Sequence, residues 1–178
     1  MQKLKKTKEG NKTQLLPVHS LEKDNHPVLV NTIQHKSIYD TNTEHRHDYF
    51  EILFFEQGGG SQLIDFKEWA LTENSCYIIY PRQVHLMKRG PHANGKMIQF
   101  HESSIISMNL RNLFYQLFFN DNPTIIFENN KEKTEKFHKM INLLNEVTEN
   151  KSLLSTEITL HYLQAFLLQL LEDKEKIK

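Results

Sequence analysis

The sequence has few of the features that mark a secreted, membrane-bound or nucleic-acid-binding chain. It contains one cysteine, Cys76, which cannot form a disulfide within the chain. No apolar run approaches the roughly 20 residues that a membrane-spanning helix needs, and the first residues lack the apolar core of a secretory signal. Basic and acidic residues number 22 each, so the chain lacks the basic excess that binding several phosphates requires. We therefore expect a cytoplasmic protein that contacts no membrane and, through this segment, no nucleic acid.

The pattern of apolar residues divides the sequence into three parts. Residues 1–26 are rich in lysine and have no regular period, which predicts a flexible basic arm, either a solvated tail or a flap over a pocket. Residues 27–107 contain short runs of Val, Ile, Phe and Tyr between turn residues, which predict a β-sandwich or barrel. In residues 108–178 apolar positions recur at helical spacing, which predicts two to three helices. The expected fold class is mainly β with C-terminal α-helices.

The last predicted helix, from about Leu153 to Lys174, carries a continuous apolar stripe. Four of its leucines advance by three and four residues in turn, as in a heptad seam: Leu160, Leu163, Leu167 and Leu170. Two interpretations remain open, because the seam can pack on the preceding helix or can join a second copy of the chain. The second interpretation makes residues 108–178 a dimerisation and linker segment, and predicts a homodimer.

The residues that carry the most chemistry stand near the middle of the predicted β part. His45, His47 and Glu51 are separated by two and four residues, so a strand places them on one face. Two imidazoles and a carboxylate can bind a divalent metal such as iron, manganese, nickel or zinc, with His85 as the candidate fourth ligand. The same side chains can instead form hydrogen bonds or contact a small effector. Glu51 lies among apolar residues, so it needs a partner if it is buried.

This stretch resembles the motifs of the cupin superfamily. The first motif, His-x-His, three residues, Glu, six residues and Gly, is matched by His45, His47, Glu51 and Gly58. Pro81 and His85 match part of the second motif, in which Arg82 stands where glycine is usual. Together with the stretch at residues 95–100 and the helices after it, the order is similar to the sensor domain of AraC/XylS-type transcription regulators, over roughly residues 32–171.

The resemblance implies a cupin-like β-barrel that binds a small-molecule effector, followed by helices for self-association. It implies a pocket with polar and aromatic lining, for which the candidates are His45, His47, Tyr49, Glu51, Tyr80 and His85. DNA would be read by a helix-turn-helix domain that this sequence does not contain. No catalytic residue and no cofactor are implied. The alternative is a stand-alone cupin enzyme, a dioxygenase or isomerase, with a metal on His45, His47, Glu51 and His85.

Overall fold

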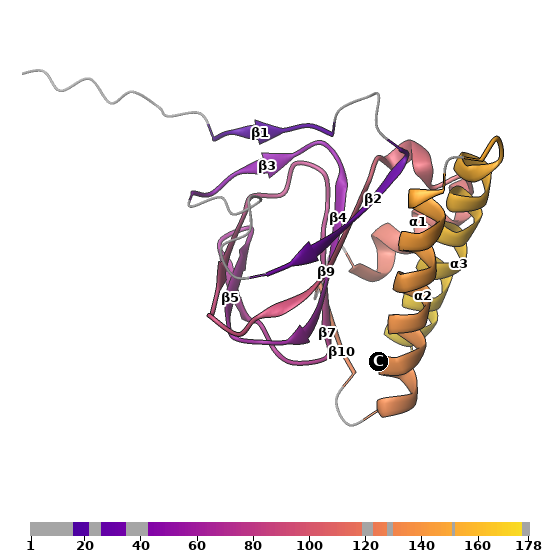
Figure 1. Cartoon of the computed structure of the whole chain (residues 1–178). Helices are drawn as coiled ribbons and strands as arrows, with labels where there is room; N and C mark the ends of the chain where they lie inside the picture. Colours follow the sequence, from indigo (N-terminus) through magenta and orange to yellow (C-terminus); the bar gives the residue numbers. More distant parts are fainter. Residues whose placement is uncertain are drawn as a thin grey trace, which may run out of the picture.

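The computed structural model describes residues 16–21, 26–34, 43–118, 123–127, 130–150 and 152–175. Most of the predicted N-terminal arm lies outside these ranges. Strands occupy the first part of the chain and α-helices the last part, which confirms the expected cupin-like, mainly β fold with C-terminal helices (Figure 1). None of the described helices is long and apolar enough to cross a membrane.

The strands of the described residues form two larger sheets and one short pair. Their bounds are β1 Val18–His19, β2 Val28–Ile33, β3 Arg46–His47, β4 Phe50–Gln57, β5 Gly60–Ile64, β6 Lys67–Ala70, β7 Ser75–Ile79, β8 His85–Arg89, β9 Asn94–Phe100 and β10 Thr124–Ile126. The order is β10-β7-β4-β9-β2 in the five-stranded sheet and β6-β5-β8 in the three-stranded sheet, and every pairing within them is antiparallel. β1 and β3 pair in parallel, and an isolated bridge joins His45 to His85.

Alternation along β4 decides which side chains face which layer. Phe50, Ile52 and Phe54 belong to the core that the five-stranded sheet shares with the helices. Leu53 and Phe55 point the other way, into a second core. Because successive strand residues face opposite sides, a strand buried on both faces reads as a continuous apolar run, as residues 52–55 do.

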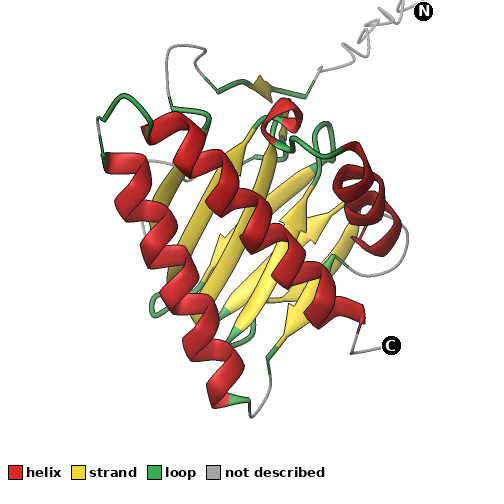
Figure 2. Cartoon of the chain, turned by 90° about the vertical axis from the view of Figure 1, so that its right-hand side faces the viewer, coloured by secondary structure: helices red, strands yellow, loops and turns green. Residues whose placement is uncertain are grey.

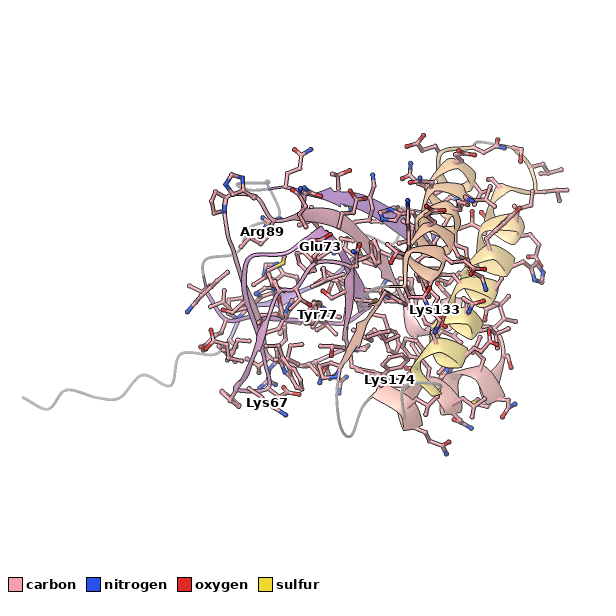
Figure 3. All side chains as sticks on the ribbon, turned by 90° about the horizontal axis from the view of Figure 1, so that it is seen from below. Lys67, Glu73, Tyr77, Arg89, Lys133 and Lys174 are labelled. Atoms are coloured by element: carbon pink, nitrogen blue, oxygen red, sulfur yellow. The ribbon has the colours of Figure 1, made fainter. Side chains whose placement is uncertain are left out.

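The second core fills the space between the two sheets. It contains Leu53 and Tyr77 from the large sheet and Ile64 from the small one, with Trp69 and Met87 packed against it. In Figure 3 the labelled Tyr77 lies within the β part, whereas Lys174 lies toward the helices. The two sheets thus enclose a mostly apolar interior, and any polar site must lie at its margin.

The helices cover the outer face of the five-stranded sheet (Figure 2). After a 3-10 turn at Glu102–Ser104 come α1 (Met108–Phe118), α2 (Lys131–Glu149) and α3 (Ser155–Glu175). Between α1 and α2 the chain returns to the sheet, where β10 pairs with β7. The helical part of the chain therefore also supplies an edge strand to the β part.

The structure corrects the expected role of the leucine seam. Leu163, Leu167 and Leu170 are each 0% exposed and belong to the core beneath the helices, and Leu160 is half-buried. Their own chain already covers the first three, so these three leucines are not a surface for a second copy. Of the two interpretations that the spacing allowed, packing within the chain is the one observed. A heptad spacing shows that a helix has an apolar side but does not say which element covers it.

Candidate functional site

Three side chains meet at the margin of the inner core. His47 comes from β3, Glu51 from β4 and His85 from β8, and one potential ligand atom from each lies within 4.8 Å of the others. The residues are 0%, 5% and 3% exposed, respectively. A bend at residues 48–49 separates β3 from β4, so the placement of the two strands, and not alternation along one strand, brings His47 next to Glu51. The small sheet brings in His85. Four residues were expected to converge, His45, His47, Glu51 and His85, and the last three of them do.

The imidazole of His47 is fixed by a hydrogen bond to the backbone. Its Nδ1 donates to the carbonyl oxygen of Tyr49 at 2.6 Å, and the Tyr49 ring stacks on it. Since a carbonyl can only accept, the proton of neutral His47 sits on Nδ1 and the lone pair on Nε2. That Nε2 atom has no hydrogen-bond partner among the described residues, and it lies 3.9 Å from Glu51 Oε2.

The imidazole of His85 contacts a residue of the small sheet. Gln62 Nε2 lies 3.1 Å from His85 Nδ1, while His85 Nε2 and Gln62 Oε1 are buried without partners within the described part of the chain. A half-turn of the Gln62 amide would present Oε1 to Nδ1 instead, and His85 would then hold its proton on Nδ1. Gln62 can thus support the tautomer that leaves the Nε2 lone pair of His85 free to bind a ligand.

Burial sets the charge of the three groups. It lowers the pKa of His47 to about 4, although the hydrogen bond to Tyr49 opposes the change. Burial also lowers the pKa of His85, with the neighbouring histidines adding to the effect. Glu51 has its pKa raised by burial to about 7, against a 2.9 Å hydrogen bond from Gln99 Nε2 that favours the ionised form. At neutral pH both imidazoles are therefore uncharged and able to share a lone pair.

The remaining predicted site residues occupy different positions. His45 lies beside the group rather than within it, with its ring 4.1 Å from that of His85 and its Nδ1 3.1 Å from the Thr43 carbonyl. Tyr49 borders the site, since its hydroxyl accepts from Gln99 Nε2 at 3.3 Å. Burial also raises the pKa of Tyr49, so this hydroxyl stays protonated.

Tyr80 does not belong to the site, which corrects the expectation that it lines the pocket. Its ring lies in the core under the helices, next to Phe50, and its hydroxyl donates to the carbonyl of Phe114. The physical reason is alternation along the strand. Tyr77 and Ile79 face the inner core, so Tyr80, one position after Ile79, faces the core under the helices.

Sequence reasoning missed two glutamines that support the site. Gln62 on β5 and Gln99 on β9 are both buried and bond to His85 and Glu51, respectively. Gln99 lies directly across from Glu51 in the register of β9 and β4. The signal in the sequence was a polar side chain at an inward position of an otherwise apolar strand, because such a group needs a buried partner.

The chain matches the family model described as "AraC-like ligand binding domain" over residues 27–169. It belongs to that family. Among solved structures, the AraC-like transcriptional activator CuxR has a TM-score of 0.45 and 10% identity, covering 84% of this chain and 49% of that one. A cupin protein from Bacteroides fragilis has a TM-score of 0.35 and 18% identity, covering 45% of this chain and 69% of that one. EutQ from Clostridium difficile has a TM-score of 0.32 and 12% identity, covering 46% of this chain and 57% of that one.

This AraC-like domain thus spans about half the length of the activator CuxR. No curated protein is detectably similar to it in sequence. The family match covers both β part and helices, and includes all three residues of the buried group.

Proposed function

We propose that this AraC-like domain is the sensor of a transcription regulator and that it binds its effector at His47, Glu51 and His85. The observation that carries the proposal is the pair of buried Nε2 atoms that have no hydrogen-bond partner within the described part of the chain and lie close to a carboxylate. A buried polar atom without a partner costs about 1–3 kcal/mol. A ligand that satisfies these atoms recovers that cost, so the group is better suited to binding than to structural support.

The donor set favours a divalent transition-metal ion as this effector. Two neutral imidazoles and one carboxylate form a combination that zinc, iron, manganese or nickel accepts, and the Nδ1 hydrogen bond of His47 leaves Nε2 available as the ligand atom. His47, Glu51 and His85 would hold the ion, and Gln62 would orient His85. The bound ion would supply positive charge that draws the three side chains together and keeps Glu51 ionised.

The same three residues would serve the alternative function of a metal-dependent cupin enzyme. An enzyme also needs an opening through which a substrate reaches the ion. The three side chains are buried, and the nearly buried ring of His45 lies 4.1 Å from that of His85. This enclosure favours a binding site for a very small ligand, and with the family match it favours sensing over turnover.

We further propose that the domain forms a homodimer through the outward face of α3. Five exposed residues, of which Leu154 lies in the turn just before α3, advance by four, three, four and three positions: Leu154, Ile158, His161, Ala165 and Leu168. This is the spacing of a coiled-coil seam, and the small Ala165 lets two helices approach closely. In a dimer with a two-fold axis, this face of α3 packs against the same face of the second copy. DNA would then be bound by a domain other than this one.

A metal titration tests the sensing proposal. Protein stripped with a chelator, purified without a histidine tag, should bind one Zn²⁺ or Co²⁺ per chain in a calorimetric titration. His85→Ala and Glu51→Gln should each weaken binding by at least about tenfold, because each removes a ligand. The control is His92→Ala, since His92 is exposed and outside the group. Absence of binding by the unchanged protein, or equal loss in the control, would contradict the metal proposal.

A further inference from the structure

A loop next to the site contacts both of its histidines. The loop joins β7 to β8, and its last residue, Val84, immediately precedes His85. Inside the loop, the backbone N–H of Arg82 donates to the carbonyl of His47 at 2.7 Å. Displacement of this loop therefore changes the backbone that leads into His85, although two backbone hydrogen bonds to His45 also hold His85, and it removes a contact to the backbone of His47.

One residue outside the loop binds it at three points. Asp65 lies in the turn between β5 and β6, and its backbone N–H donates to the carbonyl of Val84 at 2.8 Å. Its carboxylate accepts from the backbone N–H of Val84 at 3.1 Å and from the side-chain amide of Gln83 at 2.8 Å. The other end of the Gln83 amide accepts from the backbone N–H of Tyr80 at 2.7 Å. The carboxylate thus ties the loop both directly and through Gln83.

The backbone around these contacts has unusual conformations. Asp65 and Phe66 have φ of 44° and 69°, and Arg82 has φ of 71°, all in the left-handed region that favours glycine. Non-glycine residues persist there only when surrounding contacts hold them, so the two turns depend on each other. The same β-strand that leads into Asp65 carries Gln62, whose amide contacts the His85 ring.

We propose that Asp65 is a positioning residue for the binding site, holding His85 and His47 so that their Nε2 atoms face Glu51. Asp65 is itself exposed and is not part of the three-residue group, so it acts through the loop and does not contact a ligand. Gln62 fixes the ring of His85 and Asp65 fixes the backbone before it. The role as a positioning residue for a ligand rests on the proposed function of the site.

The test compares Asp65→Ala with a matched control on the same hairpin. Glu68→Ala removes another exposed carboxylate, which accepts from the hydroxyl of Ser61 at 2.6 Å, without touching the loop. In the Co²⁺ titration, Asp65→Ala should weaken binding by about tenfold or more, and Glu68→Ala by less than about twofold. Asp65→Asn should be intermediate, because its oxygen can still accept from Val84 but its amide cannot accept from Gln83.

A second measurement needs no metal. In the metal-free protein labelled with ¹⁵N-histidine, the ring signals of His85 and His47 should shift or broaden in Asp65→Ala and stay unchanged in Glu68→Ala. Unchanged ring signals in Asp65→Ala would overturn the positioning role, as would equal effects of the two variants. Failure of the unchanged protein to bind Co²⁺ would instead overturn the metal proposal, while the ring signals still decide the role of Asp65. If Asp65→Ala does not fold, Asp65→Asn replaces it in both measurements.

Discussion

The two faces of the five-stranded sheet differ in the polarity of their buried side chains. The face under the helices is apolar and aromatic, with Phe50 stacked on Phe100 and in edge contact with Phe114. The inner face is apolar over most of its area but ends in a buried polar group in which two imidazole nitrogens have no partner among the described residues. The difference shows where stability and function separate, because a packed apolar face stabilises the fold, whereas buried nitrogen atoms without a hydrogen-bond partner are available to a ligand.

The largest effect should come from placing charge on the helix side. Leu163→Glu combined with Leu167→Glu buries two unpaired carboxylates, each costing several kcal/mol, against a total stability of about 5–15 kcal/mol for a typical domain. We expect loss of the folded state, seen as loss of the cooperative transition in thermal circular dichroism. A folded monomer with unchanged melting behaviour would show that these leucines are intermolecular after all.

The matching change on the outward face of α3 should separate association from folding. Ile158→Glu combined with Leu168→Glu places charges where both side chains are exposed, so folding stability should change by less than about 1 kcal/mol. Sedimentation should show a dimer for the unchanged protein and a monomer for this variant, with the same circular dichroism spectrum. A dimer that persists in the variant would exclude the proposed seam on α3.

The next prediction concerns the inner face, where replacing a buried ionisable group should raise the stability of the fold instead of lowering it. Burial raises the pKa of Glu51 from 4.5 to about 7, so between these values the folded state binds more protons at this carboxyl than the unfolded state. The stabilisation that protonated Glu51 gives the folded state is therefore fully present below about pH 4.5 and is lost as the pH rises through about 7. Glu51→Gln avoids that loss and should stabilise the metal-free protein by roughly 2–3 kcal/mol at about pH 8, with no gain near pH 4.

Denaturant unfolding at several pH values in the presence of chelator measures this difference. The lowered pKa of His47 affects the stability of both proteins and largely cancels in the comparison. Glu68→Gln, at an exposed position on β6, is the control and should change stability by less than about 0.5 kcal/mol at either pH. A Glu51→Gln gain that is equally large near pH 4 would contradict the assignment to the buried carboxyl. A stabilised variant that no longer binds metal would sharpen the contrast between the two faces.

The smallest effect should come from the loop beside the site. Arg82 has φ of 71°, and glycine adopts this conformation without the steric cost of a Cβ atom. Relief of this strain, about 1–2 kcal/mol, is partly offset by the greater entropy of glycine in the unfolded chain, so Arg82→Gly should raise stability by up to about 1 kcal/mol, measured as an increase in the denaturant midpoint. Lys88→Gly, within the extended strand β8, should lower it by a similar amount. A destabilised Arg82→Gly variant would show that the arginine side chain contributes more than the strain it causes.

The helical layer illustrates the limits of reading a pattern. The three-and-four spacing of leucines in α3 correctly indicated a helix with a buried side, but packing within the chain and pairing between chains produce the same spacing. The structure distinguished them because α3 packs on α1, α2 and the sheet of its own chain, which buries Leu167 and leaves Leu168 exposed. The expectation for Tyr80 was wrong because Tyr80 continues the alternation of Cys76 and Ile78, whose side chains face the helices, and the sequence did not show which face of β7 the helices cover.

The sequence by itself determined which side chains of β4 share a face, because alternation along a strand is local geometry and needs no knowledge of the rest of the fold. It also determined the change from strands to helices after about residue 107, which follows from the change in hydrophobic period. The meeting of His47 with Glu51 depended on the fold, since a bend at residues 48–49 separates β3 from β4. Only the tertiary structure decided that His85 completes the group while His45 stands beside it, and that Gln62, Gln99 and Asp65 support it. Those contacts join strands and turns far apart along the chain, and their geometry depends on how the two sheets pack together.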